Sequence, residues 1–68
     1  MKVGDVIVDR DGDAGRITHI DKSDVIIDYQ VPWLPKEIFI NVDNVVTVIE
    51  GLGEDDAMAY IRMINRMQ

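Results

Sequence analysis

Residues 24–30 read DVIIDYQ, and the apolar side chains of Val25, Ile27 and Tyr29 occupy every second position. Successive side chains of a β-strand point to opposite faces, so this spacing predicts a strand with those three side chains on one face and Ile26 on the other. Valine and isoleucine are also stiff at χ1, which suits them to a pleated surface. This segment is therefore the clearest β-strand of the chain.

The same branched chemistry continues through the first three quarters of the chain, where turn residues cut it into short strands. Asp11-Gly12 supplies the positive φ of a tight turn, Gly15 allows a bulge or sharp bend, and Lys22-Ser23 forms a two-residue connection. Two prolines in the segment 31–36 lack backbone N–H donors, so that segment is predicted to be a loop. The strands expected from this pattern are 3–8, 16–21, 24–30, 37–41 and 46–49, with a single tight turn at 42–45.

Five short strands with tight turns in under 50 residues favour a small closed barrel, because closure removes the exposed edges of a flat sheet. Four motifs carry a further likeness: KVGDVIV at 2–8, GRITHI at 15–20, VIIDY at 25–29 and VDNV at 42–45. In this pattern the chain resembles the small barrels of the Src-homology-three type, including the KOW-like domains, which place a one-turn 3₁₀ helix before the last strand. The resemblance implies a five-stranded barrel over residues 1–50 within a single domain of residues 1–68.

Residues 54–67 carry a different pattern, in which apolar side chains recur with a period near 3.6 rather than two. Gly53 is placed to act as the N-cap of a helix, and three acidic residues at 54–56 lie at the positive end of its macrodipole. The apolar positions fall within an arc of roughly 160° at 100° per residue. They are Ala57, Tyr60, Ile61, Met63, Ile64 and Met67. We therefore expect an amphipathic helix over 54–67.

A helix of this length is marginal alone, so its apolar face must pack against something. We expect it to cover the open end of the barrel. The arc is wider than one packing contact needs, however, so its outer edge at Tyr60, Met63 and Met67 is available to a second chain. A partner or a homodimer formed through this edge is therefore a second hypothesis, compatible with the first.

The charge balance bears on the partner, because 13 acidic and 7 basic residues give a net charge of −6. The chain has no cysteine, no apolar run of the roughly 18 residues that a membrane span needs, and an aspartate that interrupts residues 1–8 where a secretory signal would be apolar. We therefore expect a cytoplasmic protein that does not enter membranes. An acidic surface suits a basic protein partner, including one that itself binds nucleic acid. By analogy of size and charge with small phage-encoded inhibitors, we expect a phage or bacterial accessory protein that regulates or blocks such a partner.

The segment between the first two strands is a candidate contact surface because it is acidic. Asp9, Asp11 and Asp13 alternate as at the start of a calcium-binding loop, but Ala14 and Ile20 stand where such a loop needs glycine and glutamate. We favour a solvated turn without a metal site, whose Asp11 and Asp13 contact a partner, and weak binding of a divalent cation is the alternative.

The proline-bounded loop is the second candidate because it contains the only tryptophan, Trp33, followed by Leu34. Tryptophan is enriched at the energetic centres of interfaces. In one interpretation Trp33 plugs an end of the barrel; in the other it is exposed and is the best single contact residue, together with Leu34.

No arrangement of residues indicates an enzyme or a cofactor. His19 is the only histidine, no serine has a partner base at readable spacing, and there is no glycine-rich phosphate loop. We therefore predict a non-catalytic protein-binding module. A KOW-like contact with nucleic acid or the ribosome through Arg10, Arg16 and Lys22 is an alternative, which the negative net charge disfavours. A structural protein that self-associates through its helix is the other.

Overall fold

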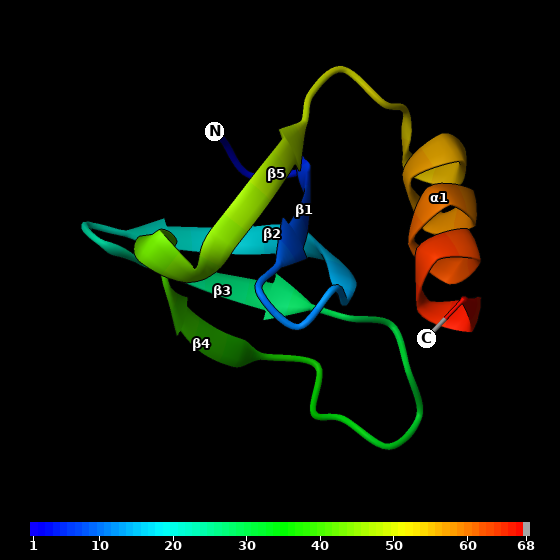
Figure 1. The fold of residues 1–68 in the computed structure, drawn as a ribbon. Helices are drawn as coiled ribbons and strands as arrows, with labels where there is room; N and C mark the ends of the chain where they lie inside the picture. Colours follow the sequence, from blue (N-terminus) through cyan, green and yellow to red (C-terminus); the bar gives the residue numbers. More distant parts are fainter. Residues whose placement is uncertain (68) are drawn as a thin grey trace.

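The chain forms one antiparallel sheet followed by one α-helix, as a computed structural model describes it for residues 1–67 (Figure 1). The elements are β1 (Val6–Asp9), β2 (Ala14–Asp21), β3 (Asp24–Asp28), β4 (Ile38–Asn41), the 3₁₀ helix η1 (Val42–Asn44), β5 (Val45–Ile49) and α1 (Glu54–Arg66). A mainly β domain with a C-terminal helix, predicted from the change in apolar period, is confirmed. The positive φ expected at Gly12 is also present, at +87°.

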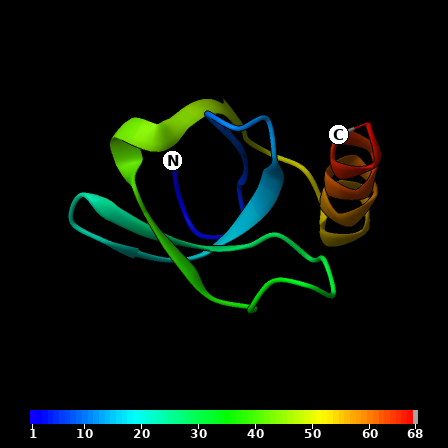
Figure 2. The ribbon, with the colours of Figure 1, turned by 60° about the horizontal axis from the view of Figure 1, so that its bottom comes forward.

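The sheet is not closed, although a closed barrel was predicted. Its strand order is β4-β3-β2-β1-β5, so β4 and β5 lie at the two edges and no ladder joins them within residues 1–67. β4 runs into β5 through the single turn of η1, so the two edge strands follow each other along the chain and do not pair. The sheet nevertheless bends strongly (Figure 2), and register shifts in the β1–β5 and β2–β3 ladders mark the bulges that help it to do so.

The first strand begins three residues later than predicted. Residues 2–5 form a turn instead, in which the Asp5 amide donates to the Lys2 carbonyl (3.1 Å) and the Lys2 amide donates to Asp5 Oδ2 (2.9 Å). Gly4 has a φ of +96°, a conformation that suits glycine and that a β-strand does not use. Val3 is consequently exposed rather than part of the sheet.

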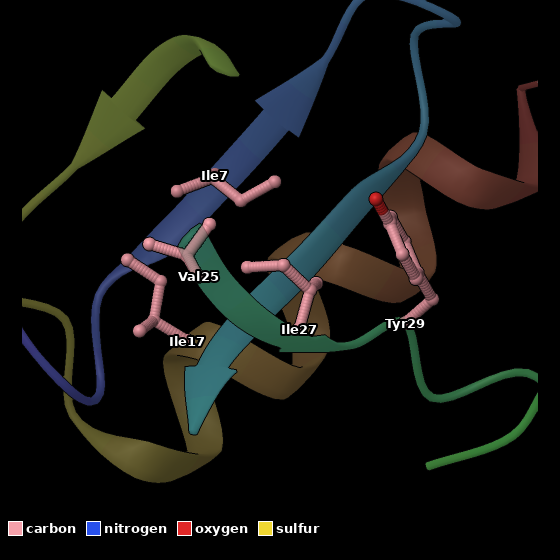
Figure 3. Packing of buried hydrophobic residues seen from close by; sticks show 5 residues of the cluster. All are labelled: Ile7, Ile17, Val25, Ile27 and Tyr29. Atoms are coloured by element: carbon pink, nitrogen blue, oxygen red, sulfur yellow. The ribbon is translucent and has the colours of Figure 1, made fainter. Parts of the chain in front are cut away.

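The main core lies on the inner face of the bent sheet. Five buried side chains from β1, β2 and the β3 segment point toward one another there (Figure 3): Ile7, Ile17, Val25, Ile27 and Tyr29. The predicted alternation over 24–30 is therefore correct. Partly buried side chains from the edge strands, Ile38, Ile40 and Val45, pack against the same cluster, so both edges contribute to one core without being paired.

The helix packs on the opposite face of the sheet, where Val6 and Ala14 form a second buried cluster with Ala57 and Ile61. The expectation that α1 would cover an open end of a barrel is therefore wrong. The physical reason is in β1, where Val6 and Ile7 face opposite sides and both are fully buried. A strand that is apolar on both faces needs cover on both, and α1 supplies the second layer.

The helix has 13 residues. Across residues 1–67 there is no helix with the length and apolar character required to cross a membrane.

Candidate functional site

The β1–β2 turn is organised by one of its three aspartates. Asp9 Oδ1 accepts hydrogen bonds from the backbone amides of Asp11 (2.9 Å) and Asp13 (3.0 Å). The Asp9 amide donates to the Asp13 carbonyl (2.9 Å), and the Gly12 amide donates to the Asp9 carbonyl (3.0 Å). Aspartate commonly bonds to the backbone two residues on in this way. Asp9 therefore fixes the turn, while Asp11 is exposed and Asp13 is half-buried.

Tyr29 holds this turn against the end of β3. Its hydroxyl donates to Asp9 Oδ2 at 2.7 Å, so both carboxylate oxygens of Asp9 are engaged. Burial raises the pKa of Tyr29 well above its usual value, and the bond to Asp9 raises it further, because both disfavour the phenolate. The carboxylates of Asp9, Asp11 and Asp13 lie within 4.8 Å of one another, but hydrogen bonds to Asp9 complete the turn without an ion.

Asp13 is the residue of this turn whose ionised form is disfavoured. Partial burial raises its pKa above the usual aspartate value, and the neighbouring charges of Asp9 and Asp11 raise it further. A cation near Asp13 would relieve that repulsion. The turn is therefore a place where positive charge is favoured.

The proline-bounded loop presents its tryptophan to solvent. The Leu34 amide donates to the Val31 carbonyl (3.3 Å), which closes a turn with Pro32 and Trp33 at its centre. Trp33 is 78% exposed, so it does not plug the core. Leu34 packs against the main core instead and anchors the loop. Of the two interpretations of Trp33, the plug is therefore wrong, and its role as a contact residue stays a prediction.

A shallow pocket of about 160 Å³ lies between the acidic turn and this loop. It is lined by Asp13, Tyr29, Val31, Trp33, Leu34 and Asn65. Three of the side chains that the sequence singled out, Asp13, Trp33 and Leu34, thus meet around one hollow, although about 20 residues separate them along the chain. We call this hollow the Asp13–Trp33 pocket.

Asn65 is a residue that the sequence interpretation missed. Its Oδ1 accepts from the Ala14 amide (2.8 Å), and its Nδ2 donates to the carbonyls of Ala14 (3.0 Å) and Tyr29 (3.1 Å). These bonds fix the C-terminal half of α1 against the start of β2 and the residue that follows β3, and both Asn65 and Tyr29 line the pocket. A signal was present, since Asn65 is a polar residue at the edge of the buried arc, one turn after Ile61.

The predicted helix edge divides into two parts. Tyr60 is half-buried and packs against the cluster between helix and sheet. Met63 and Met67 are 51% and 78% exposed. A second hollow, of about 230 Å³, runs between the proline-bounded loop and the helix, with Trp33 on one side and Arg62 and Arg66 on the other.

The basic residues of the nucleic-acid alternative are differently placed. Arg16 is half-buried; its Nε donates to the Gly4 carbonyl (3.2 Å) and its guanidinium lies 3.8 Å from the Glu54 carboxylate. Arg10 and Lys22 are exposed in two different turns, between β1 and β2 and between β2 and β3. Arg16 is therefore committed to contacts within the chain, which weakens the set as a phosphate-binding surface.

Comparison of the chain with models of protein families, with curated proteins and with solved structures finds no match in any of the three.

Proposed function

We propose that this chain is a non-catalytic protein-binding module that takes a lysine or arginine side chain of a basic partner into the Asp13–Trp33 pocket. The observation that carries the proposal is that the 78% exposed Trp33 and the half-buried Asp13 line the same hollow of about 160 Å³. A cation over an indole face gains about 0.5–2 kcal/mol. The Asp13 carboxylate, which lines the same pocket, adds charge attraction to that group, so the pocket offers both contacts that such a side chain uses.

The electrostatics of the turn support the same ligand. The carboxylate of Asp13, which lines the pocket, lies within 4.8 Å of those of Asp9 and Asp11, and the chain as a whole carries a net charge of −6. Such a surface attracts basic partners over a distance and speeds their association, in a way that salt screens. In this proposal the domain acts as an accessory or inhibitory protein by occupying a basic surface of its partner.

We also propose that the fold is of the Src-homology-three type, as a strongly bent sheet that stays open between β4 and β5. The strand order β4-β3-β2-β1-β5 and the one-turn η1 between the last two strands support this assignment. The assignment gives a scaffold and not an activity, so the functional proposal rests on the pocket.

The sole tryptophan makes the first test direct, because its fluorescence reports on the pocket itself. We would titrate the protein with an octa-arginine peptide at low and at moderate salt, and with an octaglutamate peptide as the control. We expect a saturable change in emission with octa-arginine that weakens as salt rises, and no change with octaglutamate. An emission spectrum that octa-arginine leaves unchanged at low salt would contradict the proposal.

A second test separates the pocket from the general acidity of the chain. With a fluorescently labelled octa-arginine peptide and an anisotropy readout, Trp33→Ala should weaken binding about tenfold and Asp13→Asn about threefold. The matched controls are Phe39→Ala, an aromatic that is 65% exposed, and Asp43→Asn, an exposed aspartate in η1. Neither control residue lines the pocket. Equal losses in variants and controls would mean that charge alone attracts the peptide, and would remove the pocket from the proposal.

A further inference from the structure

The outer face of α1 is a surface that the pocket does not use. Its exposed residues share one side of the helix: Asp55, Asp56, Ala59, Arg62, Met63, Arg66 and Met67. Ala59, Met63 and Met67 follow one another at intervals of four, which makes a stripe along the helix. Long side chains surround the small Ala59 and leave a hollow of about 350 Å³. The face therefore has both a knob, Met63, and a hole, Ala59.

Charge is distributed unevenly along the same face. Asp55 and Asp56 lie in the first turn of the helix, and Arg62 and Arg66 lie in its second half. Asp55 and Arg66 are 11 residues apart, which is about three turns and about 16 Å, and they point to within about 20° of the same direction. An acidic end and a basic end thus share one flank of the helix.

We infer that this face binds a second copy of the chain, with the two α1 helices antiparallel about a two-fold axis. If the axis crosses the helix between residues 60 and 61, Asp55 of each copy lies opposite Arg66 of the other. Met63 of each copy then lies within one residue of the level of the other copy's Ala59. A two-fold axis sets each flank against the same flank of its partner, so the charged ends meet in both places at once. A parallel pairing would bring like charges together.

The helix macrodipole alone explains why acids precede bases along α1, but not why they share a face with exposed methionines. Two exposed methionines on one face of a small domain have apolar surface to bury, and methionine adapts well to a partner. The helix is short, so the interface falls below the size of a permanent dimer. The pair should therefore dissociate reversibly on dilution.

Sedimentation velocity over a dilution series from about 1 mM to about 10 µM tests the inference. We expect a mass that moves from twice the 7.7 kDa of one chain toward 7.7 kDa on dilution. Asp55→Arg and Arg66→Asp should each remove the dimer at the highest concentration, because each places like charges opposite one another. The double variant Asp55→Arg/Arg66→Asp should restore it. A monomer at every concentration of the unmodified chain would overturn the inference.

The double variant also excludes the explanation that the single variants lose the dimer only because their helices are less stable. Each single reversal opposes the helix macrodipole, and the double variant opposes it at both ends, so a recovered dimer can only come from pairing between copies. Asp43→Arg, a reversal in η1, is the control that should leave the dimer intact. Circular dichroism at the lowest concentration verifies that every variant keeps its fold. Failure of the double variant to recover the dimer, or a dimer that survives both single reversals, would refute this interface.

Discussion

Replacing Asn65 with alanine should weaken the attachment of the helix to the sheet, because Asn65 makes the side-chain hydrogen bonds that join α1 to Ala14 and Tyr29. Three hydrogen bonds are lost, two with the backbone of Ala14 and one with the carbonyl of Tyr29. At about 1 kcal/mol net for each bond, the free energy of unfolding should fall by about 3 kcal/mol. A domain of this length has a total of about 3–10 kcal/mol, so the loss is a large share of it.

The loss is measurable by urea unfolding followed by far-ultraviolet circular dichroism. For a domain of this size about 3 kcal/mol corresponds to a fall in melting temperature of roughly 12–24 °C. If the helix undocks before the sheet unfolds, the slope of free energy against urea should also fall, because less surface is then exposed in the main transition. The control is Lys36→Ala, an exposed residue of the proline-bounded loop that does not line the Asp13–Trp33 pocket, which should cost less than about 0.5 kcal/mol.

The result that would refute this reasoning is an Asn65→Ala variant within about 0.5 kcal/mol of the unmodified chain. It would mean that the apolar contacts of Ala57 and Ile61 hold the helix by themselves and that water replaces the lost partners. Asn65 would then not be needed to hold α1 beside the Asp13–Trp33 pocket.

Three further changes test the sheet and the acidic turn. Gly15→Ala should lower the free energy of unfolding by about 2 kcal/mol, because a Cβ there would overlap a β3 side chain and lie 3.1 Å from a β3 carbonyl. Gly53→Ala, with open space around it, should cost far less, and equal costs in urea unfolding would contradict this reasoning. Tyr29→Phe should cost about 2 kcal/mol at pH 7 through the lost bond to Asp9. The folded pKa of Tyr29 is raised, so this stability is present below pH 10 and is lost as pH rises further; a difference from Phe that stayed constant from about pH 9 to pH 11.5 would contradict it. The pKa of Asp13 is also raised in the folded state, so ionisation of its carboxyl opposes folding. Asp13→Asn should therefore raise the urea midpoint at pH 7 but not near pH 3. A lower midpoint at pH 7 would be evidence against the cause assigned to the shift.

The strands were predictable because their signals are local. Alternation at Val25, Ile27 and Tyr29 indicates one buried face whatever surrounds it. Gly12 indicates a turn because glycine readily adopts the positive φ that the turn requires. The role of Gly15 was not predictable in the same way. It lies inside β2 opposite Ile7 and leaves room for a β3 side chain, which depends on a neighbour that the sequence does not place.

The position of the helix and the pocket depend on tertiary contacts, and there the sequence was a weaker guide. Residues 6–8 read VIV, which places apolar side chains on both faces of β1 and indicates a second layer. That inference was open to the sequence alone, yet the amphipathic helix was assigned to a barrel end. The sequence alone could not show that Asp13 and Trp33 line one pocket. That arrangement requires the β1–β2 turn and the loop after β3 to lie at the same end of the sheet.

The acidic turn has more negative charge than the hydrogen bonds of its backbone use, and this excess supports the proposal that the turn binds a basic side chain. The bonds that define the turn go to Asp9, whose two oxygens accept two backbone amides and the Tyr29 hydroxyl. The carboxylate of Asp13, within 4.8 Å, adds repulsion to a turn that is already complete. A bound cation would turn that repulsion into affinity. Asp13→Asn should therefore stabilise the fold and weaken octa-arginine binding together, whereas in a purely structural turn the stability would change without a matching loss of binding.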